Sequence, residues 1–370
     1  MLSPDGAGMG QVLPVRRFNR KRAGRNPALT LVCAATQQVS GVEEGMMGRI
    51  ALAMAAAAVM ATGAVSVQEI ATVHPRSLAY VLQAEGLGSS RQEAVRRLGE
   101  CGRDWIVIDT SFSGDADGRW TAADIKAIRA GQPGRKVLAY LSIGEAEDYR
   151  RYWKREWDID RDGHPDAKAP IWLCNENPDW KGNYKVRYWN EAWQAIILEL
   201  LDEAIKTGFD GVYLDIVDGF EFFEYDPARK DWIDNRSNPV TGKTYREDMI
   251  AWVQRIATHT RHRKPGFIVV PQNGVQLLEN TGYMATIDAI GVEDLFTIGN
   301  KPQTSEHKKY SLGFLEKIRP TGKPVLIIEY ATKPDMVQRS VKGAGENGFV
   351  LLVTDRELKT LGRCGSIAIK

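Results

Sequence analysis

The 370-residue sequence has few cysteines and histidines, which limits the kinds of site that it can build. Cys33 lies near the N-terminus, and Cys101, Cys174 and Cys364 are the other three cysteines. No pair has CxxC spacing and the five histidines are scattered, so the sequence predicts no zinc or other metal site, and no cofactor. Cys101 and Cys364 are candidates for a disulfide in an exported protein, and free buried thiols are the alternative.

The sequence also lacks an apolar run long enough to cross a bilayer. The run Ile50 to Met60 is too short, but it follows Arg49 and precedes small residues, an order typical of a secretory signal peptide. We therefore expect residues 1–64 to be a disordered leader and signal peptide, with the true start near Met46 or Met47. A membrane anchor with a basic tail is the alternative. The mature protein would be secreted or periplasmic, and at a membrane only through an uncleaved signal.

No excess charge of either sign marks the expected mature chain. Residues 1–64 hold seven of the 49 Lys and Arg residues but only three of the 47 Asp and Glu residues, so the slight basic excess belongs to the leader. The remainder is close to neutral, and nothing in its bulk charge indicates nucleic-acid binding.

Short apolar runs alternate with helix-like stretches from about residue 72 to residue 370. Eight runs read as strands: 78–82, 105–109, 137–143, 211–216, 267–271, 289–292, 325–330 and 349–354. The alternation predicts an α/β fold, a single-domain (β/α)8 TIM barrel, and we expect a monomer. An open doubly wound sheet is the alternative, but no GxGxxG pattern follows the first run.

Two connections, 145–189 and 220–245, are too long for ordinary barrel loops, and both follow strands, which places them at the barrel mouth. Both are rich in aromatic residues, whose rings can stack on the apolar faces of sugars. We expect about half of these aromatic side chains to pack beneath the loops instead.

Acidic residues follow the predicted strands, where a carboxylate is cheaper to place than in a core. They are Asp109, Glu145, Asp215, Asp218, Glu293, Asp294, Glu329 and Asp355. The smallest set of catalytic groups in a glycoside hydrolase is two carboxyl groups on opposite sides of a sugar-sized gap. Asp215, after the fourth strand, is the candidate nucleophile. Glu293, after the sixth, is the candidate acid/base, with a pKa raised by apolar neighbours and by Asp215.

Further polar side chains near the strand ends are candidates for binding substrate or for orienting a carboxylate. These are Asp109, Tyr140, Glu145, Asp218, Asn273 and Glu329, and Gln272 could act in the same way. The acidic mouth suits a cationic or amino-sugar substrate.

Several sequence blocks resemble glycoside hydrolase family 114. They are VLAYLSIGEAEDYRRYW, NPDWKGNYKVRYWNEAW, GFDGVYLDIVDGF, VVPQNG and AIGVEDLF, in order between about residues 77 and 355. The resemblance implies a (β/α)8 barrel with endo-α-1,4-polygalactosaminidase activity and retaining cleavage of α-1,4-linked galactosamine polymers. It implies an aspartate nucleophile at strand four, Asp215, and a glutamate acid/base at strand six, Glu293. A non-catalytic carbohydrate-binding barrel is the alternative.

Overall fold

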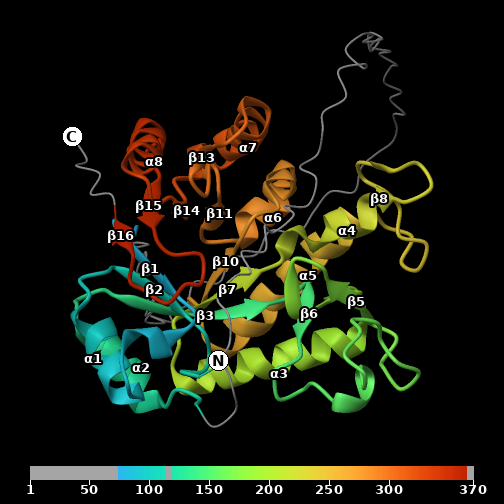
Figure 1. Ribbon diagram of the computed structural model, residues 1–370, viewed down its shortest axis with the longest axis horizontal. Coiled ribbons are helices and arrows are strands. Elements are labelled where there is room, and N and C mark those ends of the chain that lie inside the picture. The colour runs from blue at the N-terminus through green and yellow to red at the C-terminus, as the bar shows by residue number, and fades with distance from the viewer. Residues whose placement is uncertain (1–73, 114–117, 365–370) are drawn as a thin grey trace, which may run out of the picture. The chain divides into compact units, whose positions relative to one another are not determined.

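The computed structural model describes residues 74–113 and 118–364, and the strands run through the centre of this part of the chain (Figure 1). Eight parallel strands form the barrel wall: β1 (Leu78–Val81), β2 (Trp105–Ile108), β3 (Lys136–Ser142), β7 (Gly211–Asp215), β10 (Ile268–Pro271), β11 (Ile290–Glu293), β14 (Val325–Glu329) and β15 (Val350–Val353). All eight predicted strands are therefore present, and each predicted end lies within one residue of the observed end.

The strands lie side by side in chain order, as a barrel requires. One hydrogen-bonded sheet runs β1-β2-β3-β7-β10 and a second begins β11-β14-β15. A parallel bridge between Gln272 and Gly291 joins β10 to β11, and β1 packs beside β15. The predicted (β/α)8 architecture is confirmed.

Helices connect successive strands on the outside of the barrel. The main ones are α1 (Arg91–Glu100), α2 (Ala122–Ala130), α3 (Glu191–Thr207), α5 (Tyr245–Arg263), α6 (Thr281–Thr286), α7 (Ser305–Ile318) and α8 (Pro334–Asn347). Helix α3 ends at Gly208, whose φ of +100° is the left-handed C-cap that the sequence indicates. After β15 the described chain forms β16 (Arg363–Cys364), antiparallel to β15, where an eighth helix would begin.

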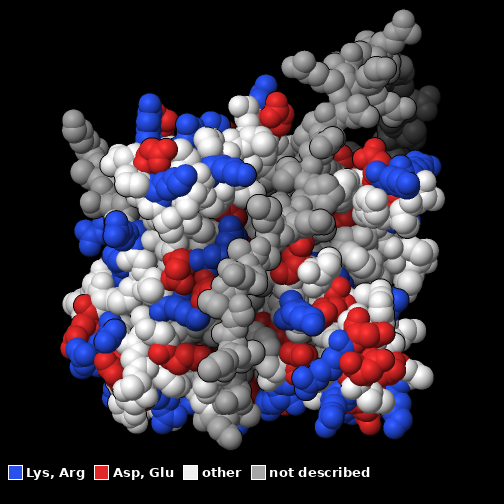
Figure 2. Space-filling view, viewed as in Figure 1, with Lys and Arg blue, Asp and Glu red and all other residues white. Residues whose placement is uncertain are grey.

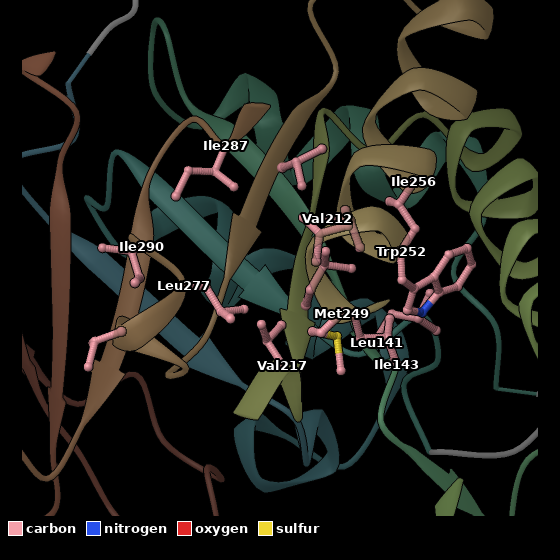
Figure 3. Close-up of a cluster of buried hydrophobic side chains, with 14 of the residues drawn as sticks. Leu141, Ile143, Val212, Val217, Met249, Trp252, Ile256, Leu277, Ile287 and Ile290 are labelled. Atoms are coloured by element: carbon pink, nitrogen blue, oxygen red, sulfur yellow. The ribbon is translucent and has the colours of Figure 1, made fainter. Parts of the chain in front are cut away.

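The core has two layers because strand side chains alternate between the two faces of the wall. The inner layer fills the barrel with Leu78, Tyr80, Trp105, Val107, Leu138, Tyr140, Tyr213, Val270, Leu326, Ile328, Tyr330 and Leu352. The outer layer packs the other strand face against the helices. Figure 3 shows part of it, with Val212 of β7 close to Trp252 and Ile256 of α5.

The long connection after β3 folds into a small antiparallel sheet. Its strands are β4 (Glu145–Glu147), β5 (Leu173–Asn177) and β6 (Trp180–Val186), in the order β4-β6-β5, with the single turn η2 (Arg155–Trp157) between β4 and β5. We call residues 145–189 the β3–α3 insertion. The connection after β7 carries α4 (Phe220–Glu224) and the short pair β8 (Tyr225–Asp226) and β9 (Asp231–Trp232).

None of the helices formed by the described residues is both long and apolar enough to cross a membrane. On the face shown in Figure 2, basic and acidic residues are interspersed. The predicted leader and signal peptide, residues 1–64, lie outside the described residues.

Candidate active site

Four neighbouring strands each place a polar side chain at the C-terminal end of the inner barrel face. On β7, Tyr213 faces the interior, so Asp215, two residues on, continues the same face at the mouth. The same spacing carries β10 from Val270 to Gln272, and β14 from Ile328 to Tyr330. Glu293 ends β11 between them. Alternation along the strands thus brings these polar groups together. The residues that directly follow three of them, Ile216, Asn273 and Asp294, have left-handed φ angles of +55°, +60° and +51°.

Asp215 is held by three hydrogen-bond donors. The Tyr140 hydroxyl donates to Oδ2 at 2.7 Å, and the backbone N–H of Ile216 donates to Oδ1 at 2.8 Å. The Gln272 side-chain amide also donates to Oδ1, at 2.8 Å. Because each donor favours the ionised carboxylate, the three together offset part of the cost of its half-buried position. Tyr140 is thus in place to orient a carboxylate, one of the two roles that the sequence predicts for it.

Gln272 joins the two candidate catalytic acids. Its Nε2 also donates to Oε2 of Glu293 at 2.9 Å, while the Tyr330 hydroxyl donates to Oε1. Since one nitrogen lies 2.8 Å and 2.9 Å from an oxygen of each acid, those oxygens of Asp215 and Glu293 are at most about 5.7 Å apart. The two predicted catalytic carboxyls therefore lie within one sugar ring of each other.

Burial raises the pKa of both acids, to different extents. It raises the pKa of Glu293 to about 7, aided by the charge of Asp215 and opposed by the Tyr330 hydrogen bond. It raises the pKa of Asp215 to about 6, opposed by the Tyr140 and Ile216 hydrogen bonds. Asp215 accepts three hydrogen bonds and Glu293 accepts two, so Asp215 is the acid that ionises more readily, and the favoured one-proton state of the pair has the proton on Glu293.

The packing beneath Asp215 and Glu293 requires a glycine, Gly291, which has no side chain. A Cβ added at Gly291, two residues before Glu293, would lie 1.9 Å from the Tyr213 hydroxyl oxygen. Only glycine leaves room there for the tyrosine that sits below Asp215. Asn273 supports β11 from the outside, since its Oδ1 accepts the backbone N–H of Glu293 at 3.1 Å. This contact orients Glu293, whereas the predicted contact of Asn273 with substrate stays a prediction.

Two of the predicted substrate-binding acids are engaged by basic residues. Asp109 is buried, and its two carboxylate oxygens accept from both terminal nitrogens of Arg150, at 2.8 and 2.6 Å. Glu145 is fully buried in an ion pair with Lys185, and Asn177 donates to its Oε1 at 2.9 Å. The Asp109–Arg150 pair holds the β3–α3 insertion to the barrel, whereas the Glu145–Lys185 pair links β4 to β6 within the insertion.

Glu329 points away from the inner face, because its neighbours Ile328 and Tyr330 both point inward. It is fully buried and accepts the backbone N–H groups of Phe296 and Thr297, at 2.7 and 3.1 Å. Its carboxylate therefore fixes the chain after β11. In this arrangement its predicted contact with substrate would require these hydrogen bonds to break.

Asp218 differs from the other predicted acids because no hydrogen bond or ion pair involves its carboxylate within residues 74–113 and 118–364. It is half-buried in the single turn after β7. Burial, followed by the charges of Glu221 and Asp215, raises its pKa well above the usual range, while Lys185 opposes the shift. Asp218 thus places a carboxyl group without a hydrogen-bond or ion-pair partner, among the described residues, beside the candidate nucleophile.

Arg356 and Tyr330 are site residues that the sequence reasoning missed. The Arg356 guanidinium lies over the Tyr330 ring, 3.9 Å from its centre, and pairs with Asp294 at 2.7 Å. Arg356 therefore balances the negative charge of Asp294, and it also holds the ring of Tyr330, whose hydroxyl contacts Glu293. Tyr330 could have been found from period-two alternation on β14, whereas nothing in the sequence connects Arg356 to it.

The aromatic residues of the two long connections divide between buried and exposed, as expected. Trp157, Trp172, Tyr184, Tyr188 and Phe220 are buried beneath the loops, whereas Tyr149, Trp180, Phe222 and Tyr225 are exposed. The exposed rings are the ones available for stacking on a sugar.

The three cysteines among the described residues are half-buried free thiols. Cys364 lies in β16 rather than in a last barrel helix, and its sulfur donates to the backbone oxygen of Leu78 at 3.0 Å. The thiols of Cys101 and Cys364 are thus not joined in this structure.

Comparison with known proteins agrees with this architecture. The model of glycoside-hydrolase family GH114 matches residues 103–368. An uncharacterized protein of Deinococcus radiodurans is 37% identical over 282 residues, covering 76% of this chain and 81% of the relative. The uncharacterized protein MJ1477 of Methanocaldococcus jannaschii is 36% identical over 270 residues, covering 69% and 71%.

Two solved structures share the fold at low sequence identity. The glycoside hydrolase domain of PelA from Pseudomonas aeruginosa matches with a TM-score of 0.54 and 19% identity, covering 78% of this chain and 98% of that one. Aspergillus fumigatus Ega3, in complex with galactosamine, matches with a TM-score of 0.51 and 18% identity, covering 76% and 91%. The family match extends over most of the chain, and this protein therefore belongs to glycoside-hydrolase family GH114 and is a glycosidase.

Proposed function

We propose that the protein cleaves an α-1,4-linked galactosamine-containing polysaccharide with retention of configuration, using Asp215 as nucleophile and Glu293 as acid/base. The observation that carries the proposal is the shared hydrogen bond donor, Gln272, between the two carboxylates. The two carboxylate oxygens that Gln272 bonds are at most about 5.7 Å apart, which favours the roughly 5–5.5 Å spacing of retaining enzymes over the roughly 6.5–9.5 Å spacing of inverting ones.

The reaction has two steps. In the first, Asp215 attacks the anomeric carbon while Glu293 gives its proton to the departing glycosidic oxygen, which leaves a glycosyl ester on Asp215. In the second, Glu293 takes a proton from water as the water oxygen attacks the same carbon and releases Asp215. The different pKa values of the two acids suit these roles, because Asp215 must be ionised and Glu293 protonated at the start.

A cationic amino sugar suits the charges that remain free at the mouth. Asp109, Glu145 and Asp294 are each paired with a basic residue. Within the described ranges, no Lys or Arg forms an ion pair with Asp215, Asp218 or Glu293. We assign Asp218 to the substrate ammonium group, whose charge would favour the ionised form of this acid. The galactosamine bound to the similar structure Ega3 supports this substrate class.

The catalytic roles can be separated by azide rescue. Asp215→Ala and Glu293→Ala should each lose several powers of ten in rate on the polymer. On an activated aryl glycoside, azide should restore both variants and give adducts of opposite anomeric configuration. In Asp215→Ala, azide takes the place of the missing nucleophile and attacks the anomeric carbon directly. In Glu293→Ala, azide attacks the glycosyl ester that forms on Asp215. Asp179→Asn, an exposed acid in the insertion, is the control and should keep wild-type activity.

Asp218→Asn tests the substrate. The variant should lose activity on a deacetylated galactosamine polymer while changing little on an N-acetylated one, because only the former carries ammonium groups. Equal losses on both polymers would remove Asp218 from amine recognition. Full activity of Asp215→Ala without azide would contradict the catalytic assignment and favour another acid.

We also propose that the enzyme is exported after cleavage of a signal peptide in residues 1–64, with the barrel domain in 72–370. The support is the run Ile50 to Met60 behind Arg49. Mass spectrometry of the exported protein should find an N-terminus near Val65. Residues 1–46 on the mature protein would contradict a start at Met46 or Met47.

A further inference from the structure

Three aspartates gather in the β3–α3 insertion, away from the pair Asp215 and Glu293. Asp158, Asp160 and Asp162 alternate along the chain after η2 and are followed by Gly163. One carboxylate oxygen from each lies within 4.8 Å of the others. Asp158 is buried, whereas Asp160 and Asp162 are exposed, so the cluster opens to solvent on one side.

The buried member of this cluster has an oxygen without a partner. Asp158 is 4% exposed, and its Oδ2 accepts from the Tyr184 hydroxyl at 2.5 Å and from the Gly163 N–H at 3.0 Å. Its Oδ1 is buried and has no hydrogen-bond partner. A bound cation would give this buried carboxylate oxygen the partner that it lacks.

No basic side chain neutralises the cluster within the part of the chain that the structure describes. None of the ion pairs there involves Asp158, Asp160 or Asp162. Each of the two exposed aspartates uses one oxygen to accept a backbone N–H, from Asp162 and His164 respectively. Each therefore keeps a second oxygen for an external ligand.

The spacing identifies the ion. Carboxylates at positions one, three and five with glycine at six follow the calcium-loop pattern DxDxDG, and a hard, all-oxygen donor set suits Ca²⁺. Gly163 has a φ of +84°, the left-handed conformation that the sharp turn at position six requires. Position twelve is Ala169 instead of glutamate, so the loop lacks the bidentate ligand that this position supplies in the calcium-loop pattern. This predicts a weak site, with a Kd of about 0.1–1 mM.

We propose that Asp158, Asp160 and Asp162 bind one calcium ion that stabilises the β3–α3 insertion. Tyr184, which donates to Asp158, lies in β6, the central strand of the small sheet. The neighbouring β6 residue Lys185 pairs with Glu145 of β4. The ion would therefore stabilise the sheet that packs beside the barrel mouth. This departs from the sequence expectation of no metal site, and it does not depend on the proposed substrate.

Terbium luminescence on the full chain tests the site directly. Tb³⁺ occupies calcium sites and is sensitised by nearby aromatic rings, and Tyr184 touches the cluster. Excitation near 280 nm should give saturable Tb³⁺ emission that Ca²⁺ displaces and equimolar Mg²⁺ does not. Asp160→Asn and Asp162→Asn together should weaken Tb³⁺ binding by at least tenfold. Asp179→Asn, in the same insertion, should leave it unchanged.

Thermal unfolding gives a second readout that needs no lanthanide. Millimolar Ca²⁺, compared with EDTA, should raise the Tm of the wild type by about 2–4 °C and leave the double variant unchanged. The single variant Asp160→Asn, an exposed and isosteric change, covers the case in which the double variant does not fold. Equal Tb³⁺ binding by wild type and the folded variants, failure of Ca²⁺ to displace Tb³⁺, or no calcium-dependent Tm shift would overturn the proposal.

Discussion

Removing single tyrosine hydroxyls should move the two limbs of the pH–rate profile separately. Tyr330 donates to Glu293, and Tyr140 donates to Asp215 at 2.7 Å. Phenylalanine removes only the hydroxyl. At position 330 it also keeps the ring over which Arg356 lies at 3.9 Å, so that packing and the cation–π contact persist. The two variants are therefore clean tests of the hydrogen bonds.

The direction follows from which form each tyrosine stabilises. Both hydroxyls donate to a carboxylate, so their loss raises the pKa of that acid. Glu293 must be protonated to act, so Tyr330→Phe should move the alkaline limb of kcat/KM to higher pH. Asp215 must be ionised, so Tyr140→Phe should move the acidic limb to higher pH. The first variant broadens the active range and the second narrows it.

The size follows from the energy of one hydrogen bond to a charged group, about 1.5–3 kcal/mol. At about 1.4 kcal/mol per pKa unit, each limb should move by about one to two pH units. The wild-type limbs should lie near the pKa values of about 6 and about 7 that burial gives Asp215 and Glu293, with apparent values that belong to the pair.

The assay is kcat/KM on the polymer from pH 4 to 9, at constant ionic strength, for the wild type and both variants. The position of each limb is read from the shape of the plot of kcat/KM against pH. A loss of rate that is equal at every pH therefore does not change it. An alkaline limb that stays in place in Tyr330→Phe, or moves only in Tyr140→Phe, would refute the assignment of Glu293 as the acid and Asp215 as the nucleophile.

Three further outcomes follow from the packing around the site. Arg150→Ala should lower the free energy of unfolding by about 3–5 kcal/mol in urea titrations, because it leaves two buried carboxylates unpaired. Arg151→Ala, next to it but exposed, should cost less than about 1 kcal/mol. Gly291→Ala should lower Tm and activity, because its Cβ would clash with a buried tyrosine hydroxyl, whereas Gly313→Ala in α7, with open space around it, should not. Gln272→Leu should reduce kcat at least tenfold in a steady-state assay with little loss of Tm, and an unchanged kcat would show that the shared amide is dispensable.

The sequence predicted the barrel well because its signal is local. Each strand of a parallel barrel is buried on both faces, so it reads as a short apolar run, and turns and helix caps delimit it. Residues 1–64 have no such signal beyond the apolar run Ile50 to Met60. The eighth helix was expected from the regularity of the repeat, but the chain after β15 forms β16 instead. A regular alternation cannot predict where the chain departs from it at the end of the repeat.

The candidate site was predicted less evenly, because an acid at a strand end can point in either direction. Asp215 and Glu293 end strands on the inner face and come together, and Gln272 bridges them. Glu329 also ends a strand but lies one residue out of phase, and so it holds the backbone of the neighbouring segment. Counting from the inward-facing Ile328 would have shown this in advance.

The charge of the mouth depends on long-range pairing, which the sequence does not encode locally. Six strands end in acids, and this indicated a strongly acidic mouth. Arg150 reaches Asp109 from the β3–α3 insertion, and Arg356 reaches Asp294 from beyond β15. Lys185 pairs with Glu145 across the small sheet within that insertion. Each of these basic residues is far from its acidic partner along the sequence, and the two meet only in the folded protein. Counting the acids at the strand ends therefore overestimates the negative charge that is left unpaired at the mouth. Recognition of a polycation would therefore depend on the few acids left without a basic partner, not on the number of acids at the strand ends.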